Sequence, residues 1–454
     1  MKKDDRRGAR AAADHSSQDA SLRSRRRWLA GAGAAGLLAA GAARGHASAQ
    51  ASNPVSGAES PGPTHTRVTG TPEPAAAQSE RHAFYGAHQQ GILTPRPAAG
   101  IVAAFDVLAT TPDALADLFK TLTARIAFLT QGGPAEQADP GFPPPDSGIL
   151  GPDIPPDALT ITVSVGASLF DDRFGLSAVK PHQLVRMARF PNDALDASLC
   201  HGDLLLQFCA NTPDTNIHAL RDIVKNLPGA LMLRWKQEGS VPVRKAPAGT
   251  PPENARNFLG FRDGSANPDS SDARLMDDLV WVREQAPEPA WTVGGSYQAV
   301  RLIRNFVERW DRTPLREQEM ILGRRKATGA PLDGKTEADE PNYTQDPKGA
   351  VTPMDAHIRL ANPRTEAATA TRILRRPFNY SNGVTRSGQL DMGLLFISYQ
   401  ADLEQGFIAV QRRLDGEPLE EYIKPVGGGY FFVLPGARDQ GDYLGRGMLA
   451  AARS

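Results

Sequence analysis

The chain has 454 residues, with 51 basic and 51 acidic side chains and therefore no formal net charge. Residues 1–49 hold ten of the basic and four of the acidic side chains, which leaves 41 basic and 47 acidic residues in the remainder. A mildly acidic body gives no electrostatic reason to bind nucleic acid. Only Cys200 and Cys209 could form a disulfide. They flank a predicted strand, too far apart for a bond, and are interpreted as core thiols.

Residues 1–49 are typical of a secretory signal peptide. Arg25 and Arg26 form a twin-arginine pattern, an apolar Ala/Gly-rich stretch follows to about residue 43, and small residues at 47–49 suit cleavage. The alternative is a membrane anchor, but the stretch is short of the ~20 apolar residues that span a bilayer. We therefore expect export of the folded protein to the periplasm by the twin-arginine pathway, with no membrane span after cleavage.

Residues 50–81 are rich in Pro, Ala, Ser, Thr and Gly, which predicts a disordered linker. The first half of the following body alternates strands with helices. Strands are predicted at 100–108, 159–165, 203–210 and 230–235, with helices at 111–126 and 212–226. Both helices begin Thr-Pro-Asp, where the threonine can cap the helix and the proline suits its first turn.

The second half repeats this order. Strands are predicted at 297–305, 392–399 and 429–434, helices at 314–323 and 402–414, and a polar surface excursion at 325–350. Each half then follows a β-α-β-β-α-β pattern. The sequence thus predicts an α+β fold of two ferredoxin-like domains with antiparallel sheets, similar to a dimeric α/β barrel. We place the domains at 82–270 and 271–454.

The run Asn-Phe-Leu-Gly-Phe-Arg-Asp-Gly-Ser at 257–265 carries chemistry. Its two glycines, Gly260 and Gly264, flank Asp263 and predict a tight turn that presents one carboxylate. Alone, the pattern also fits an ordinary turn with an Asx cap. Downstream lie His357, in Asp-Ala-His-Ile-Arg-Leu-Ala-Asn-Pro-Arg, and Arg375, in Ile-Leu-Arg-Arg-Pro-Phe. An acid, an imidazole and a guanidinium can hold a haem iron and break a peroxide.

This combination resembles the dye-decolorizing (DyP-type) haem peroxidase family, over about residues 82–450. The resemblance is to its secreted branch, the periplasmic deferrochelatase/peroxidases of ferrous-iron uptake. It implies one haem b per chain, in a pocket mainly in the C-terminal half. The absence of Cys-x-x-Cys-His from the sequence excludes covalent c-type attachment.

The resemblance also implies roles for particular residues. His357 would be the axial ligand of the haem iron, and Asp263 and Arg375 the catalytic pair opposite it. The backbone of Gly264, Ser265 and Ala266 would approach the haem closely, which is why glycine suits position 264. The remaining implied haem contacts are Asn362, Pro363, Arg364 and Arg375, with Leu394 and Phe396 lining the distal pocket.

The implied function is reduction of hydrogen peroxide through a ferryl intermediate, with oxidation of dyes or phenolic donors. One alternative is deferrochelation, the release of iron from haem, with an iron-uptake permease as partner. A second is a non-enzymatic periplasmic haem carrier, which has no need of the Asp263–Arg375 pair. The sequence leaves the natural reductant and the oligomeric state open, a homo-oligomer included.

Several further assignments stay open at the level of sequence. Arg376 could face a haem propionate or solvent, and Arg304 could pair with a propionate or form a surface ion pair. Asp355 and Asp391 are candidates for the acid that orients His357. Four aromatic residues are candidates for relaying an electron to the surface, although packing is the more usual role: Trp235, Trp281, Trp310 and Tyr343.

Overall fold

The structure is a computed structural model that describes residues 78–242 and 253–453. All of them belong to one compact unit, Gly70–Ser454. The signal peptide expected at 1–49 lies outside the described residues, as does the linker expected at 50–81 up to residue 77.

The N-terminal half has the predicted β-α-β-β-α-β order. Its elements are β1 (Ala99–Val107), α2 (Pro112–Gln131), β4 (Thr160–Gly166), β5 (Leu204–Ala210), α3 (Pro213–Asn226) and β6 (Leu231–Ser240). A two-stranded ribbon, β2 (Gly133–Pro134) with β3 (Asp153–Ile154), lies between α2 and β4. After β6 come α4 (Ala273–Leu279) and then the C-terminal half.

The C-terminal half repeats the order with shorter helices. Its strands are β7 (Ser296–Asn305), β8 (Leu374–Arg375), β9 (Phe378–Val384), β10 (Leu390–Gln400) and β11 (Ile423–Val433). Between β7 and β8 lie α5 (Val307–Trp310), α6 (Leu315–Leu322), α7 (His357–Ala361) and α8 (Glu366–Thr369). A π-helical turn (Glu404–Ile408) leads into α9 (Ala409–Leu414), and α10 (Arg446–Ala451) follows β11.

The strands confirm two ferredoxin-like units. The sheet order is β4-β5-β1-β6 in the first half and β11-β7-β10-β9 in the second, and the pairs are antiparallel. The two halves join where β11 pairs with β4, and β6 meets β9 at Ser240 and Asn379. These contacts close the sheet on itself, as the comparison with dimeric α/β barrels predicts.

Local sequence explains where the long helices begin. Thr111 accepts a hydrogen bond from the backbone N–H of Ala114 at 3.2 Å, and Thr212 accepts one from Thr215 at 3.4 Å. Proline follows each cap at the first helical position. Helix α2 continues to Gln131, beyond the predicted end at 126, and stops at Gly132, whose φ is +64°.

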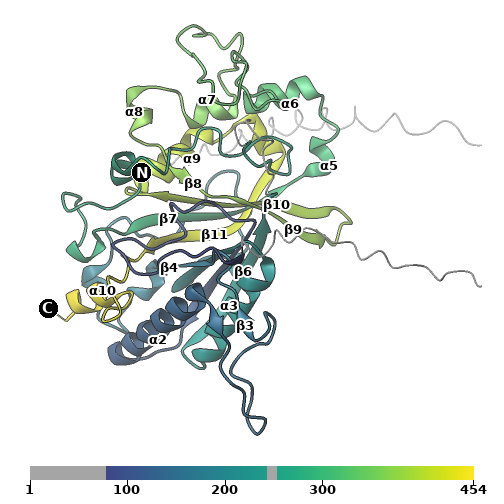
Figure 1. The fold of residues 1–454 in the computed structure, drawn as a ribbon. Helices are drawn as coiled ribbons and strands as arrows, with labels where there is room; N and C mark the ends of the chain where they lie inside the picture. The colour runs from purple at the N-terminus through teal and green to yellow at the C-terminus, as the bar shows by residue number, and fades with distance from the viewer. Residues whose placement is uncertain (1–77, 243–252, 454) are drawn as a thin grey trace, which may run out of the picture. The chain divides into compact units, whose positions relative to one another are not determined.

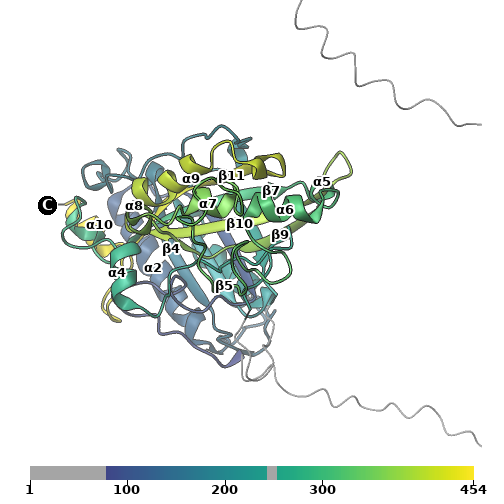
Figure 2. The same cartoon turned by 90° about the horizontal axis from the view of Figure 1, so that it is seen from above.

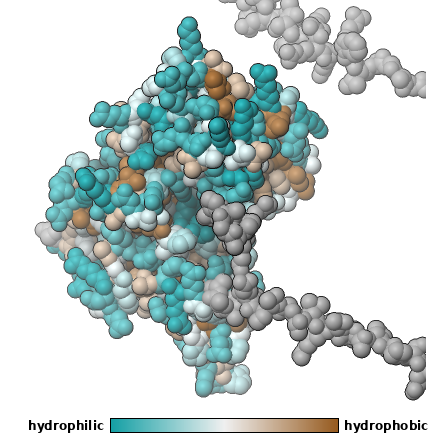
Figure 3. Space-filling model, turned by 45° about the horizontal axis from the view of Figure 1, so that its top comes forward, coloured by the Kyte–Doolittle hydropathy of each residue, from teal (hydrophilic) through white to brown (hydrophobic). Residues whose placement is uncertain are grey.

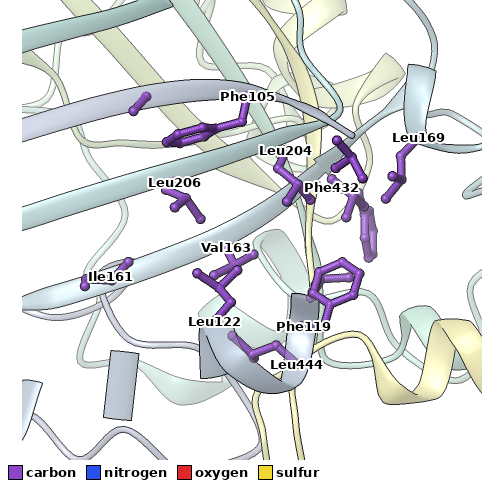
Figure 4. Packing of buried hydrophobic residues seen from close by; sticks show 14 of the residues in the cluster. Phe105, Phe119, Leu122, Ile161, Val163, Leu169, Leu204, Leu206, Phe432 and Leu444 are labelled. Carbon is purple, nitrogen blue, oxygen red and sulfur yellow. The ribbon is translucent and has the colours of Figure 1, made fainter. Parts of the chain in front are cut away.

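The helices of the two halves cover different parts of the sheet. Helices α2 and α3 lie against the N-terminal strands, while α7, α8 and α9 lie over β7 and β10 (Figures 1 and 2). Beneath α2 the core is tightly filled, and Phe119 and Leu122 on the helix face Val163 and Leu206 on the strands (Figure 4).

The outer surface is mixed in character. Figure 3 shows a largely hydrophilic face with separate apolar patches. Within residues 78–242 and 253–453, no helix is long and apolar enough to cross a membrane.

Two local expectations differ from the structure. Strand β9 was not anticipated, because its sequence Phe-Asn-Tyr-Ser-Asn-Gly-Val is polar and its last four residues are exposed. The segment predicted as one helix at 402–414 begins as a π-helical turn that packs Phe407 inward before α9 starts. The excursion at 325–350 carries neither helix nor strand, as expected.

Candidate functional site

A cavity of about 260 Å³ lies in the C-terminal half. Strands β7, β10 and β11 form one wall, α7 and α9 contribute to another, and the loop at 257–266 closes a third side. Among the described lining residues, Asn192 alone lies between β1 and β6, and the residues at 257–266 belong to the segment that follows β6. The pocket therefore lies where the sequence predicts it.

His357 is the first residue of α7 and lines this cavity. Its Nδ1 lies 2.7 Å from Oε2 of Glu417, which is 6% exposed. Burial disfavours the charged imidazolium, but the charge and hydrogen bond of Glu417 outweigh burial and raise the pKa of His357. With Nδ1–H donated to the carboxylate, the neutral ring keeps its Nε2 lone pair for a metal.

Glu417 is the functional residue that the sequence did not identify. Neither candidate that the sequence offered, Asp355 or Asp391, is the partner of His357: Asp355 is exposed, and Asp391 lies 4.0 Å from Arg304. Glu417 precedes a short 3-10 turn, Pro418–Glu421, and lies 60 positions from the histidine. No local motif links two residues so far apart, so only the fold could find the pair.

Asp263 and Arg375 lie together on the cavity wall. Arg375 Nη1 donates to Asp263 Oδ1 at 2.5 Å, and Asp263 is 9% exposed. The turn around the acid needs glycine, because Gly260 has φ +85° and Gly264 has φ +132°. The charged pair places a carboxylate and a guanidinium within reach of the same bound molecule.

Besides its φ, the structure shows a second reason for glycine at position 264. A side chain there would meet Asn254 Oδ1 at 2.6 Å, so the loop itself excludes it. The next residue, Ser265, donates to Oε1 of Glu337 at 2.6 Å. Glu337 also accepts from Asn254 at 2.8 Å and from Arg262. These bonds connect the excursion at 325–350 to the loop at 257–266 that carries Asp263, called the aspartate loop below. Ala266 lines the cavity.

Apolar side chains line the strand wall. Leu394 and Phe396 both face the cavity, as their spacing of two predicts, and lie opposite Ile303 and Arg301 on β7. Leu395 and Ile397, on the other face of β10, are fully buried in the sheet core. The wall can therefore contact a flat apolar molecule.

One edge of the cavity holds polar groups that lack partners among the described residues. These are the Tyr343 hydroxyl and Nε of Arg364, both buried. Burial raises the pKa of Tyr343 to about 12. Arg324 lines the same cavity. Donors beside an apolar slot fit a ring that carries carboxylates, and haem has both features.

The Asn-Pro-Arg segment shapes this edge. Asn362 Oδ1 accepts the backbone N–H of Arg364 at 3.2 Å, and Arg364 adopts φ +59°, which is unusual for a residue with a side chain. Arg364 Nη1 lies 3.0 Å from Glu340. Asn362 and Arg364 line the cavity, whereas Pro363 is not among its lining residues.

The structure shows what Arg376 and Arg304 contact, which the sequence left open. Arg376 faces neither a propionate nor solvent: it is 5% exposed and donates to the carbonyls of Thr94 and Pro95. The first arginine of the pair, Arg375, is thus the one at the cavity. Arg304 pairs with Asp391 and Gln389, which favours the surface ion pair.

The four aromatic candidates for electron relay are packed inside the fold. Trp310 donates to the Leu259 carbonyl, Trp235 donates to that of His201, and Trp281 stacks on His88. Tyr343 alone among the four lines the cavity.

A histidine backed by a carboxylate, an acid–arginine pair and an apolar slot with a cationic edge are the groups that a haem peroxidase site requires. The sequence comparisons agree: Dyp-type peroxidase profiles match residues 89–240 (N-terminal domain) and 254–438 (C-terminal domain). The chain belongs to the Dyp-type peroxidase family, and it is an enzyme that uses haem.

Curated relatives and solved structures support this assignment. Deferrochelatases from Escherichia coli O6:K15:H31 and Shigella boydii are each 60% identical over 374 residues, 82% of this chain and 88% of theirs. The oxyferrous complex of DtpA from Streptomyces lividans is similar, with TM-score 0.74, 36% identity, and coverage of 84% of this chain and 100% of that one. The DyP-type peroxidase from Cellulomonas bogoriensis has TM-score 0.73, 35% identity, and coverage of 82% and 99%.

Glu417→Gln should retain haem and raise the reduction potential of its iron. The carboxylate makes His357 a stronger donor, which favours the ferric state. A charge-assisted hydrogen bond contributes ~1.5–3 kcal/mol, so the rise should be ~60–130 mV. Spectroelectrochemical titration measures it. Glu420→Gln, at a cavity residue bonded to the Gly416 N–H, is the matched control. An unchanged potential in Glu417→Gln would show that Glu417 does not tune the ligand.

Glu337 should make the aspartate loop sensitive to acid. Burial raises its pKa, but hydrogen bonds from Ser265, Arg262 and Asn254 hold the pKa below its ordinary value. A depressed pKa stabilises the fold above the ordinary value of ~4.3, and this contribution is lost as pH falls through the folded-state pKa.

We expect Glu337→Gln to lower unfolding free energy by ~1.5–3 kcal/mol at neutral pH. The difference from wild type should shrink below about pH 4. Denaturant unfolding at several pH values measures this, with the exposed Glu284→Gln as control. A difference that stays constant down to about pH 3 would contradict the assignment.

Proposed function

We propose that the protein is a haem b peroxidase with one haem per chain, which reduces hydrogen peroxide and oxidises dyes or phenolic donors. The observation that carries the proposal is the shared cavity of His357 with Glu417 and Asp263 with Arg375. Haem supplies the redox centre at which the O–O bond is cleaved. The chain supplies binding, proton transfer and charge.

His357 would hold the iron through its ring, and its hydrogen bond with Glu417 would fix the ring tautomer. Asp263 would be the base that takes a proton from peroxide and gives it back to the oxygen that leaves. Arg375 offsets the negative charge that develops on the leaving oxygen. Its ion pair with Asp263 holds the two groups side by side at the cavity wall.

The other cavity residues would bind the ring and keep water away from it. Leu394 and Phe396 exclude water from the peroxide side, which strengthens the electrostatic effect of Arg375. Residues 264–266, Asn362 and Arg364 line the cavity and would border the ring, and Arg364 would meet one of its carboxylates.

A second candidate is deferrochelation, in which haem is the substrate and iron leaves the porphyrin intact. The 60% identity to proteins named Deferrochelatase favours it. The same cavity serves both activities. A haem carrier is disfavoured, because a carrier gains nothing from a buried acid–arginine pair at the haem face.

We infer that the mature protein works in the periplasm after twin-arginine export, from the Arg25-Arg26 pattern at the N-terminus. If it releases iron, an iron-uptake permease is the partner that would receive it. We keep the domain boundaries at 82–270 and 271–454, which place the aspartate loop at the end of the first domain.

Asp263→Asn and Arg375→Leu should both retain haem. At least one should slow the reaction of haem-loaded protein with peroxide by on the order of 10²-fold, the usual effect of a general base or a charge donor. Stopped-flow absorbance measures this rate.

The chain offers a matched control in Asp391→Asn and Arg304→Leu, which disrupt an acid–arginine contact outside the cavity. These should leave the rate unchanged. Wild-type rates in both Asp263→Asn and Arg375→Leu would remove the catalytic assignment and favour the carrier.

One haem-loaded sample can separate the two enzymatic activities. We expect dye bleaching that requires peroxide and leaves the Soret band intact. Porphyrin fluorescence together with iron captured by a ferrous chelator reports deferrochelation. Bleaching should fall ~10²-fold in the slower of the two variants Asp263→Asn and Arg375→Leu. Stoichiometric metal-free porphyrin without bleaching would replace the peroxidase proposal with deferrochelation.

A further inference from the structure

Arg375 lies on a very short edge strand. Strand β8 has two residues, and it pairs with β10 only through Leu374 with Tyr399 and Arg375 with Ser398. The next residue, Arg376, donates its backbone N–H to the Ile397 carbonyl at 2.8 Å. So short a strand gives Arg375 little main-chain support from the sheet.

Asn267 supplies the missing support. Its Nδ2 donates to the carbonyl of Arg375 at 2.7 Å, and its Oδ1 accepts the backbone N–H of Arg375 at 3.1 Å. One side-chain amide therefore satisfies both main-chain groups of a single residue, as a neighbouring strand would. Both bonds are made 108 positions away in the sequence.

The same turn also holds the side chain of Arg375. Gly264 accepts the backbone N–H of Asn267 at 2.9 Å, which closes a turn between Asp263 and Asn267. Asp263, just before the turn, binds the guanidinium at 2.5 Å. Arg375 is thus fixed at its backbone by one end of the turn and at its guanidinium by the other.

We propose that Asn267 is a positioning residue for the peroxide step, which acts by holding the backbone of Arg375 so that its guanidinium stays aligned with Asp263. The proposal rests on the proposed function of Arg375. Asn267 is not among the residues that line the cavity, so it acts through the arginine and not on a bound molecule.

Asn267→Ala removes both bonds, and the holoenzyme is the sample. Loss of alignment should slow the reaction with peroxide on the order of 10-fold, since small misplacements of a reacting group cost up to ~10²-fold. The value of kcat/KM for peroxide should fall, whereas kcat/KM for the dye should not. Amide hydrogen exchange at Arg375 should accelerate, because its N–H has lost its acceptor.

Asn267→Asp separates the two bonds. It can still accept the N–H of Arg375, but it cannot donate to the carbonyl, and its charge competes with Asp263 for the guanidinium. We expect a rate no faster than that of Asn267→Ala. The control is Gln89→Ala, which removes a similar two-bond amide clamp at Val163 on β4, together with a bond to the Leu434 carbonyl, outside the cavity. It should lower stability and leave the peroxide rate unchanged.

The double variant Asn267→Ala/Arg375→Leu decides the mechanism. If Asn267 acts through Arg375, the first change has no further effect once the arginine is gone. Independent, multiplying effects would overturn the proposal, and so would a wild-type peroxide rate in Asn267→Ala. If Arg375→Leu alone keeps the wild-type rate, the proposed role of Arg375 fails, and the role of Asn267 fails with it.

Discussion

The ion pair between Asp263 and Arg375 joins segments 112 positions apart, and the reactive side of the cavity depends on it. A guanidinium beside an apolar slot needs a counter-charge, and so does a carboxylate that is only 9% exposed. Each group meets the need of the other. Removing one partner leaves the other partly buried and unpaired, so the effect of any single substitution exceeds the contribution of the lost group alone.

Another part of the cavity wall follows the same principle with a different acid. His357 is backed by Glu417, which comes from the segment before β11, whereas Glu337 from the excursion fixes the aspartate loop. These carboxylates lie on loops, and the strands give the loops fixed starting points. The strands β7 and β10 thus position carboxylates that lie on segments with almost no regular secondary structure.

The repeated order of strands and helices was predictable, since buried strands and capped helices have strong local signals. The identities of Asp263, His357 and Arg375 came from motifs and a family resemblance, and the structure brings all three to one cavity. Glu417 and Asn267 escaped prediction, because each contributes one contact to a residue 60 or 108 positions away. Strand β9 escaped because it is polar and half exposed. Arg376 was misplaced, since adjacent arginines on a strand face opposite sides and only the fold shows what each side meets.

The two ferredoxin-like units treat their sheet faces differently, and this difference explains the cavity. In the N-terminal unit, α2 with 20 residues and α3 with 14 residues cover the strands with large apolar side chains. The counterparts of α2, between β7 and β8, are short, with 8 residues in α6 and 5 in α7, and the counterpart of α3 is α9, with 6 residues. Short helices cannot fill the face, so apolar side chains such as Leu394 and Phe396 border an open slot. A flat ring that fills the slot buries apolar surface that the chain leaves uncovered, and binding it stabilises the folded state. A haem bound in this slot would therefore complete the core of the C-terminal unit as well as the proposed active site.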